Sequence, residues 1–314
     1  MASDAGTTRG SERPVSPAPS GEQFELRHGD QLAVVAEVGA TLRAYSVGER
    51  EVLDGFAATD WADGARGQAL MPWPNRLGDG RYEWEGETHR LPLSEPELGN
   101  AIHGLVRWRS WNALDLSPSR AIFGLRLFPT PGYPFLLGLT IDYELGDAGL
   151  SVCARAENLG AGACPFGVGF HPYLSVGGPV DGAKLTLPAA SSMTLDERQL
   201  PVSTQPVSRT SLDFRAGRVI GDAVLDTCFC DLERDGDGRV RVTLAGADSS
   251  VSLWMGEAFE YAMVYSGDTL APARRRQGLA VEPMSCAPNA FQSGLGLVRL
   301  EPGATHLAEW GIEP

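Results

Sequence analysis

The chain has 314 residues, of which 26 are Lys or Arg and 40 are Asp or Glu, so its formal net charge is −14. A balance this acidic argues against a nucleic-acid backbone or an anionic membrane surface as a partner. No apolar run is long enough to span a bilayer, and the N-terminus lacks a secretory pattern, so we expect a cytoplasmic protein. The sequence makes no prediction of the oligomeric state.

Residues 1–22 are small, polar and rich in Pro and Gly, whereas the rest of the chain has an even composition. A segment of this kind cannot bury enough apolar surface to offset the entropy lost on ordering. We therefore expect a disordered tail over 1–22. One folded domain is expected over 23–314, because no second linker and no fixed-period repeat interrupts it.

Hydrophobic residues alternate with polar or small ones in many short segments. The first such segment predicts a hairpin, in which Tyr82–Trp84 leads through Glu85–Glu87 into Arg90–Leu93. The same period of two predicts strands over 137–145, 150–156, 240–244 and 251–255, with Gly-rich and Asp-rich turns between strands. Helical periodicity is weak throughout. The pattern predicts an all-β protein, built as one large antiparallel β-sandwich or barrel-like domain.

The segment from Pro72 to Tyr82 is the first with a chemical signature. Its prolines and glycines constrain the backbone around Asn75 and Arg76. An arginine on a constrained loop can present its planar set of donors to hydroxyl groups or carboxylates. A surface turn that leads into the hairpin explains the same residues equally well.

His103 lies in the next segment, beside Gly104, and Trp108 and Trp111 follow it. The glycine leaves room for a ligand to approach the imidazole ring. The tryptophans could offer a flat face to a sugar ring, or they could fill the core of the sandwich.

His171 lies in the segment Gly169–Tyr173 and precedes Pro172. A residue before proline is pushed out of the helical region, so His171 should interrupt a strand and direct its ring away from the sheet, opposite to Phe170. Histidine exchanges a proton near neutral pH. This setting favours a functional role for His171 over that of a satisfied core residue.

Glu282 ends the apolar run that begins at Gly278, and this run predicts a buried strand. Burial raises the pKa of a carboxyl group, which is how a glutamate becomes a general base. Alternatively, Pro283 turns a strand-end glutamate toward solvent. A second carboxylate, Asp226, could pair with Glu282 in a glycosidase, which requires two such groups at a set separation.

The five cysteines form no regular framework, which is typical of reduced thiols. Cys228 and Cys230 would point the same way from a strand, but a tetrahedral zinc site requires four ligands. We therefore interpret them as ordinary half-buried thiols and expect no metal.

In chain order these segments resemble the aldose 1-epimerase (mutarotase) family over about residues 25–312. The landmarks that match are Asn75-Arg76 with Gly80–Tyr82, Asn100 with His103-Gly104, Gly169–Tyr173, Leu225-Asp226, and Glu282 ahead of Leu300–Gly303. The resemblance implies a galactose mutarotase-like β-sandwich. It also implies an isomerase that interconverts the α and β anomers of a free aldose without a cofactor or a metal.

By the same resemblance, Glu282 is expected to be the general base at the C1 hydroxyl and His171 the general acid at the ring oxygen. The residues expected to bind the sugar are His103, Arg76, Asp226 and Asn75. The segment Pro283–Phe291 differs from the galactose-type pattern, in which a Thr-Gln pair and an aromatic-Pro-Asp segment follow the glutamate. We therefore place the chain in a bacterial branch distinct from the galactose-type enzymes.

Arg274–Arg276 lies just upstream of Glu282. This basic run is either a solvated loop or a binding site for a phosphate or sulfonate group. Two alternatives thus stand beside an epimerase of neutral hexoses. One is an epimerase for an anionic sugar, such as a hexose 6-phosphate or a 6-sulfo sugar. The other is a non-catalytic carbohydrate-binding or regulatory protein on the same fold, although the intact pair of His171 and Glu282 argues against it.

Overall fold

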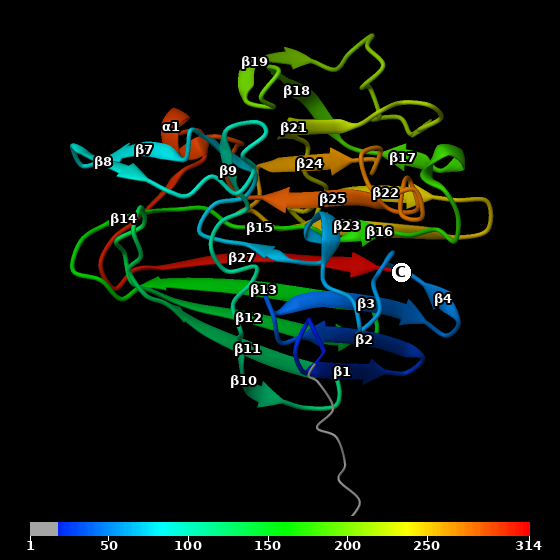
Figure 1. Cartoon of the computed structure of the whole chain (residues 1–314). Helices are drawn as coiled ribbons and strands as arrows, with labels where there is room; N and C mark the ends of the chain where they lie inside the picture. The colour runs from blue at the N-terminus through cyan, green and yellow to red at the C-terminus, as the bar shows by residue number, and fades with distance from the viewer. Residues whose placement is uncertain (1–17) are drawn as a thin grey trace, which may run out of the picture.

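The computed structural model describes residues 18–314, and these residues form a β-sandwich (Figure 1). Of the predicted tail over 1–22, residues 1–17 lie outside the described range. Residues 18–22 form a turn in which the Gly21 N–H donates to the Ala18 carbonyl oxygen at 2.8 Å, and Ser20 is buried. The α-helix α1 (Ala290–Ser293) has a single turn, and no helix in the described part of the chain is long and apolar enough to cross a membrane.

A nine-stranded antiparallel sheet forms one layer of the sandwich. In spatial order its strands are β10 (Asn112–Leu116), β11 (Arg120–Leu127), β12 (Leu137–Gly146), β13 (Gly149–Asn158), β27 (Thr305–Glu313), β23 (Ser250–Met255), β22 (Val240–Ala245), β17 (Lys184–Thr186) and β20 (Arg218–Val219). The four strands predicted from period-two alternation correspond to β12, β13, β22 and β23, so these predictions are confirmed.

An eight-stranded antiparallel sheet forms the other layer. Its strands are β19 (Pro201–Pro206), β18 (Ala189–Leu195), β21 (Asp226–Leu232), β24 (Tyr261–Tyr265), β25 (Leu279–Met284), β15 (Gly169–Phe170) and β5 (Ala69–Leu70), with β16 (Tyr173–Leu174) also paired to β25. Phe170 of this sheet packs against Trp310 of β27, with ring centroids 5.1 Å apart. The hydrophobic core therefore fills the space between the two layers.

Smaller sheets complete the domain (Figure 1). One has four strands, namely β1 (Gln23–His28), β2 (Gln31–Ala36), β3 (Thr41–Val47) and β4 (Arg50–Glu51). The others are the pairs β6 (Arg76–Gly78) with β9 (Asn100–Ile102), β7 (Arg81–Trp84) with β8 (Glu87–Arg90), and β14 (Cys164–Phe166) with β26 (Val298–Leu300). The pair β7–β8 confirms the predicted hairpin, with Trp84 opposite Glu87.

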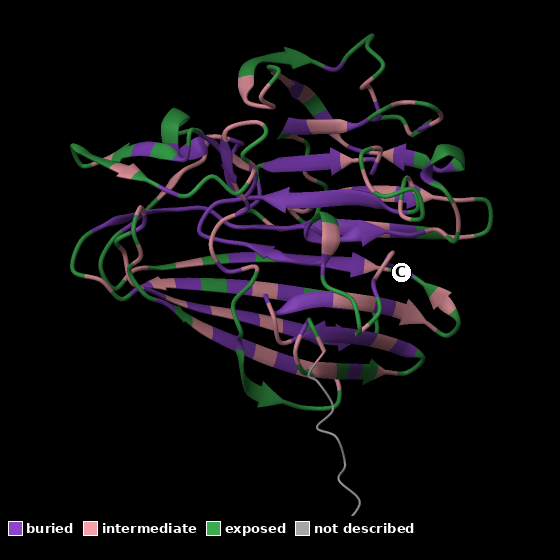
Figure 2. Cartoon of the chain, in the orientation of Figure 1, coloured by how far each residue is buried: buried purple, intermediate pink, exposed green. Residues whose placement is uncertain are grey.

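Burial differs between strands of the two layers (Figure 2). Along β12, the odd-numbered residues from Leu137 to Leu145 are buried, while the residues between them are partly or fully exposed. All six residues of β25 are buried. Because β25 has no solvent-facing side, a charged residue on it is placed in an apolar environment.

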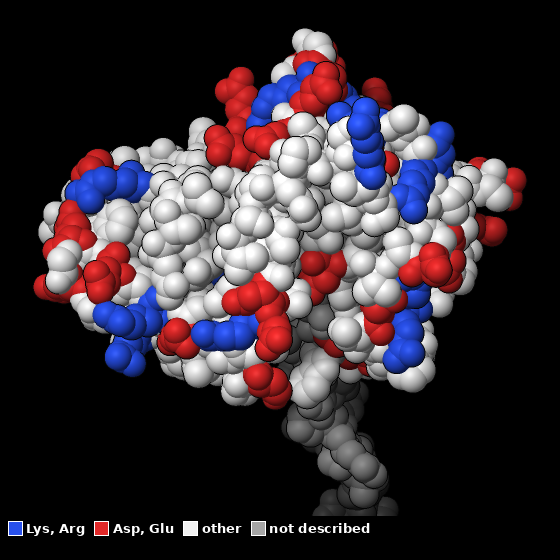
Figure 3. Space-filling model, turned by 90° about the horizontal axis from the view of Figure 1, so that it is seen from above, with Lys and Arg blue, Asp and Glu red and all other residues white. Residues whose placement is uncertain are grey.

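Charged side chains are interspersed on the face shown in Figure 3, where acidic and basic groups lie next to one another. Among the ion pairs of the described residues, Arg120 and Asp142 lie 2.6 Å apart, and Arg299 and Glu301 lie 2.7 Å apart. Exposed pairs of this kind typically contribute about 0–1 kcal/mol each. The excess of acidic residues is therefore not gathered into one patch on this face.

Candidate active site

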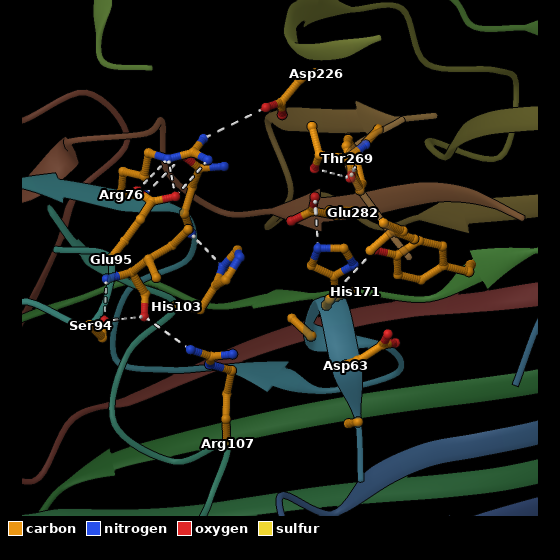
Figure 4. A pocket seen from close by; sticks show the side chains of 18 of the residues that line it. Asp63, Arg76, Ser94, Glu95, His103, Arg107, His171, Asp226, Thr269 and Glu282 are labelled. Atoms are coloured by element: carbon orange, nitrogen blue, oxygen red, sulfur yellow. Dashed lines mark hydrogen bonds and ion pairs between the residues drawn. The ribbon is translucent and has the colours of Figure 1, made fainter. Parts of the chain in front are cut away.

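A cavity of about 650 Å³ opens beside the eight-stranded sheet, and all six site residues predicted from the sequence line it (Figure 4). They are Asn75, Arg76, His103, His171, Asp226 and Glu282. Asn75 and Arg76 are neighbours at the start of β6, and the other four come from separate strands or turns, so the fold brings together side chains that are far apart in the sequence.

Glu282 and His171 form the floor of this cavity. Glu282 Oε1 lies 3.3 Å from His171 Nε2, and only 3% and 6% of the two side chains are exposed. The alternative that Pro283 turns Glu282 toward solvent is therefore wrong. Glu282 belongs to the middle of the fully buried strand β25, as the apolar run predicted.

His171 occupies the break between β15 and β16, as its position before Pro172 predicted. Its backbone N–H donates to the Gln68 carbonyl oxygen at 3.1 Å, and its carbonyl accepts from the Gly67 N–H at 2.8 Å. The imidazole ring stacks on Tyr173, with centroids 5.1 Å apart and planes 17° apart. The Arg66 guanidinium lies 4.0 Å from the same tyrosine ring, so the ring of His171 rests on an aromatic plane that is itself held by a cation.

Burial drives the two floor residues toward their uncharged forms. It raises the pKa of the Glu282 carboxyl well above its usual value, and the Asp226 carboxylate acts in the same direction while Arg76 opposes it. Burial also lowers the pKa of His171 to about 3, aided by the cations of Arg107 and Arg66. Burial therefore favours the arrangement in which the proton that this pair shares lies on Glu282 rather than on His171.

His103 is held in one protonation state by the loop that faces it. The ring Nδ1 of His103 accepts a hydrogen bond from the backbone N–H of Asn75 at 3.2 Å. The backbone N–H of His103 donates to the Asn75 carbonyl oxygen at 2.9 Å. Burial lowers the pKa of His103 well below its usual value, with Arg107, His171 and Arg76 contributing. A neutral imidazole whose Nδ1 is an acceptor carries its proton on Nε2, so His103 is a hydrogen-bond donor.

The backbone around His103 is tightly constrained. His103 and Gly104 both have positive φ angles, of 61° and 69°. A Cβ atom on Gly104 would lie 2.0 Å from the carbonyl oxygen of Met71. Glycine is therefore required for the chain to pass Met71 closely and present His103 to the cavity.

Arg76 is fixed by a carboxylate that the sequence did not reveal. Its Nε and Nη2 both donate to Glu95, at distances of 2.8–3.1 Å, and Asn100 Nδ2 donates to the same carboxylate at 2.9 Å. Its remaining terminal nitrogen, Nη1, lies 4.0 Å from Asp226 Oδ2. Glu95 thus engages two of the three guanidinium nitrogens of Arg76 and leaves Nη1 directed toward Asp226 and the cavity.

Asn75 positions other residues of the site. Its Oδ1 accepts the Arg76 N–H at 2.8 Å, and its backbone holds His103. Its role in contacting a sugar, which we expected from the sequence, stays a prediction.

Several further residues line the cavity without having been singled out as ligands, among them Trp61, Asp63, Glu95, Arg107, Tyr173 and Thr269. Arg107 is partly buried, its buried Nε has no hydrogen-bond partner, and desolvation lowers its pKa to about 10. Tyr173 was visible in the sequence as part of the His-Pro-Tyr motif. Glu95 and Arg107 lie in segments with no local signal for a pocket.

Other interpretations require correction. Trp108 lines the cavity and is 57% exposed, but Trp111 is buried in the core at 1%. Cys228 and Cys230 are fully buried, not half-buried, and pack among Met193, Met263 and Met284.

The basic run Arg274–Arg276 does not line the cavity. Arg274 pairs with Asp54 at 3.0 Å, Arg276 pairs with Asp268 at 2.9 Å, and Arg275 is exposed. The run therefore gives no support to an anion site in this cavity.

A metal ion suits the floor of the cavity poorly. His103, His171 and Glu282 each offer a ligand atom, and these atoms lie within 4.8 Å of one another. A metal would have to bind His103 through Nε2, which holds its proton because Nδ1 accepts the Asn75 N–H. Loading the site would thus require His103 to give up that backbone contact or to become an anion.

Residues 22–313 match the family model described as aldose 1-epimerase. The chain belongs to the aldose 1-epimerase family. It is 34% identical to the uncharacterized protein YihR of Escherichia coli, with 91% of each chain covered. It is 27% identical to the aldose 1-epimerase of the same organism, with 84% of this chain and 87% of that protein covered.

Solved structures confirm the fold expected for this family. A GalM/aldose epimerase homologue from C. elegans superimposes with a TM-score of 0.81 at 18% identity, covering 93% of this chain and 97% of that one. Galactose 1-epimerase from Lactobacillus acidophilus superimposes with a TM-score of 0.75 at 20% identity, covering 91% and 92%. The protein is therefore a galactose mutarotase-like β-sandwich and an isomerase of the epimerase type, so a purely non-catalytic role is set aside.

Proposed function

We propose that this epimerase interconverts the α and β anomers of a free hexose by acid–base opening and closure of the ring. The observation that carries the proposal is the pair of Glu282 and His171, 3.3 Å apart on the floor of a cavity large enough for a sugar. Anomer exchange requires a proton to leave O1 and another to reach the ring oxygen O5. A carboxylate and an imidazolium side by side meet this need.

The ring opens when the Glu282 carboxylate takes the proton of the C1 hydroxyl and protonated His171 gives its proton to O5. The C1–O5 bond breaks, C1 becomes an aldehyde, and C5 carries a hydroxyl group. Rotation about C1–C2 then presents the other face of the aldehyde to the C5 hydroxyl. On closure His171 takes the proton of the C5 hydroxyl and Glu282 gives its proton to the carbonyl oxygen O1, so the cycle is balanced and the two residues exchange their roles.

Burial of the pair favours ring opening. Before opening, the pair must be charged, with Glu282 as carboxylate and His171 as imidazolium. After opening both residues are neutral, which is the arrangement that the raised pKa of Glu282 and the lowered pKa of His171 favour in this cavity. Burial therefore favours the two proton transfers that accompany ring opening, and these are the transfers that the transition state requires.

The remaining residues hold the sugar in place. His103 donates from Nε2 to an oxygen of the substrate, and its neutral state keeps this donor available over the physiological pH range. Arg76 Nη1 and the Asp226 carboxylate, 4.0 Å apart, offer a donor and an acceptor to neighbouring hydroxyl groups.

NMR exchange spectroscopy at anomeric equilibrium tests the proposal with glucose, galactose and a hexose 6-phosphate. Wild-type protein is expected to accelerate the exchange of at least one of these sugars, and Glu282→Gln to abolish the acceleration. Absence of acceleration for every sugar contradicts the proposed reaction. A full rate in Glu282→Gln contradicts the assignment of the base.

An epimerase for an anionic sugar is the second candidate, and one observation favours it. Arg107 lines the cavity, and in the described part of the chain its guanidinium donates to the Gln68 side-chain oxygen and the Ile102 carbonyl oxygen rather than to a carboxylate. A partly buried cation of this kind could receive a phosphate or sulfonate. In this case Arg107→Gln lowers kcat/KM for the hexose 6-phosphate and spares glucose, whereas an equal effect on both sugars removes the candidate.

A further inference from the structure

Residues 63–68 contact both His171 and its neighbour Tyr173. The backbone of this segment exchanges two hydrogen bonds with the backbone of His171, at 2.8 and 3.1 Å. The Tyr173 hydroxyl donates to a carbonyl oxygen of the same segment at 2.9 Å. The segment also carries Arg66, to which the ring-opening reaction assigns no role.

Arg66 is a buried cation whose hydrogen-bonding capacity is only partly used. It is 1% exposed, and its Nη1 pairs with Asp54 Oδ2 at 2.6 Å. Its Nε lies 3.6 Å from the partly exposed Asp63, and among the described residues neither Nε nor Nη2 has a hydrogen-bond partner. Asp54 also pairs with Arg274 at 3.0 Å, so one carboxylate serves two guanidinium groups. A buried cation with unused donors costs free energy, so stability alone does not explain Arg66.

The imidazole of His171 lacks the second hydrogen bond that commonly orients a functional histidine. Its Nε2 faces Glu282 at 3.3 Å, but its Nδ1 is buried and has no hydrogen-bond partner within residues 18–314. A carbonyl or carboxylate often accepts from this second nitrogen and fixes the ring. Here the imidazole instead stacks on Tyr173, with planes 17° apart, and the Arg66 guanidinium lies 4.0 Å from the centre of the tyrosine ring. The orientation of the imidazole therefore depends on ring contacts that end at a cation held by an aromatic face.

The charges around His171 determine how readily it releases a proton. Besides the tyrosine ring, four titratable groups face it. Glu282 favours the imidazolium form, His103 is kept neutral by burial with its ring centroid 5.4 Å away, and the cations of Arg66 and Arg107 disfavour the imidazolium. Arg107 lines the cavity, whereas Arg66 does not. The charge of Arg66 therefore stays in place whichever sugar is bound.

We propose that Arg66 is the positioning residue of the catalytic acid: it holds the Tyr173 ring on which His171 rests, and its fixed charge makes protonated His171 a better proton donor to O5. This inference rests on the proposed function. A carboxylate in the same place would also orient the ring, but it would stabilise the imidazolium and so retain the proton that O5 must receive. Asp54 keeps Arg66 in its buried position, and Arg274 of the basic run shares that carboxylate.

Arg66→Met tests both parts of this role in the exchange assay. The variant leaves Asp54 paired with Arg274, so no buried carboxylate loses its last partner. We expect kcat to fall roughly tenfold with KM changed little, because a misoriented acid slows proton transfer. The acidic limb of kcat/KM should also move up by about one pH unit, because loss of a nearby cation raises the pKa of His171. Arg275→Met is the matched control, since the same change at an exposed arginine should alter neither quantity.

Arg66→Lys separates the positioning of the ring from the effect of charge. Lysine keeps the charge but lacks the planar group that covers the tyrosine ring. The acidic limb should therefore stay at its wild-type position while kcat falls about threefold. A wild-type kcat in this variant overturns the inference even where Arg66→Met does not fold. A wild-type acidic limb in folded Arg66→Met overturns it as well.

NMR titration of the His171 ring in sugar-free protein supplies a measurement that needs no turnover. His171→Asn assigns the signals. The wild-type ring is expected to titrate near its pKa of about 3, and the ring in Arg66→Met about one pH unit higher. Equal titration in the two proteins overturns the inference and leaves the proposed function standing. Absence of exchange for every sugar contradicts the proposed function instead, and the titration alone then decides whether Arg66 acts on His171.

Discussion

Strands β12 and β25 belong to different layers of the same sandwich, and they differ in how the fold covers them. β12 buries one face and exposes the other, so its polar residues reach solvent. β25 is buried at all six positions, and Glu282 lies in the middle of that run. The acidic residues of β12 therefore lie on its solvent-facing side, whereas burial raises the pKa of Glu282 on β25.

This comparison explains where the reactive groups of the enzyme lie. Desolvation is the largest cause of the pKa shifts of Glu282, His171 and His103. For Glu282 the full cover of β25 provides that desolvation. The eight-stranded sheet thus carries the two residues that form the floor of the cavity.

The same change from Glu to Gln, made once in each sheet, tests this difference most directly. Glu282→Gln is expected to lower kcat by about two to four orders of magnitude, because it removes one partner of the proton transfers. Glu144→Gln, at an exposed position of β12, should leave kcat unchanged. Circular dichroism and thermal unfolding check that both variants fold. Similar rates for the two variants would contradict the role of β25.

Truncation of a core-facing side chain of β12 should instead lower stability and leave catalysis unchanged. Ile141 is fully buried, and Ile141→Ala is expected to reduce the free energy of unfolding by about 2–5 kcal/mol through lost burial and a cavity. At a temperature where the variant is folded, kcat should match the wild type. Urea denaturation and the exchange assay together measure this. A large loss of kcat in folded protein would show that the nine-stranded sheet also shapes the site.

The pH profile tests the shared proton of the buried pair. The working pair carries one proton, so activity should fall when a second proton binds near the pKa of His171, which is about 3. It should also fall when the only proton leaves, at the raised pKa of Glu282. We expect kcat/KM to stay level through slightly acidic pH and to decline about tenfold per pH unit on the alkaline side. An acidic decline centred near 6.5, the pKa of a solvent-exposed histidine, would contradict this account.

Substitution of Glu95 should have a smaller effect, on substrate binding rather than on proton transfer. Glu95→Gln weakens the bidentate hold on Arg76, and KM is expected to rise roughly tenfold with kcat less affected. The pKa of Asp226, which the Glu95 charge raises, should fall in this variant. Glu97→Gln is the control, because Glu97 lines the same cavity but is exposed. Equal effects of the two variants would argue against positioning of Arg76 by Glu95.

The smallest effect is expected on the outer face of β12. Thr140 neighbours Ile141 in the sequence but points away from the core and is only partly buried. Thr140→Ala should change the free energy of unfolding by no more than about 0.5 kcal/mol. Urea denaturation of this variant and of Ile141→Ala tests directly whether core-facing and solvent-facing residues alternate along β12. Equal losses would mean that both faces of β12 are structural.

Much of the fold was predictable because its signals are local. Alternation of apolar residues predicted β12, β13, β22 and β23, since each of these strands has one face against the core. Pro172 predicted the break at His171, and the apolar run before Glu282 predicted a strand buried on both faces. These signals require only a few consecutive residues and the backbone geometry that those residues allow.

Other features depend on neighbours that the sequence does not place. Glu95 reaches Arg76 because β6 pairs with β9 and brings the two segments together. Arg274 and Arg276 suggested an anion site, but Asp54 and Asp268 neutralise them. Trp108 and Trp111 carry the same signal in sequence, and only the packing makes one a cavity wall and the other a core residue.

The sequence by itself therefore determined the strands, the broken strand at His171, the buried glutamate, and, through five motifs in order, the family. Tertiary structure alone decided which charges are paired, which aromatic rings are exposed, and that burial raises the pKa of Glu282 and lowers that of His171. The physical reason is that backbone preference and hydrophobic period act over a few residues. Desolvation and ion pairing are instead set by whatever the complete fold brings within a few ångströms.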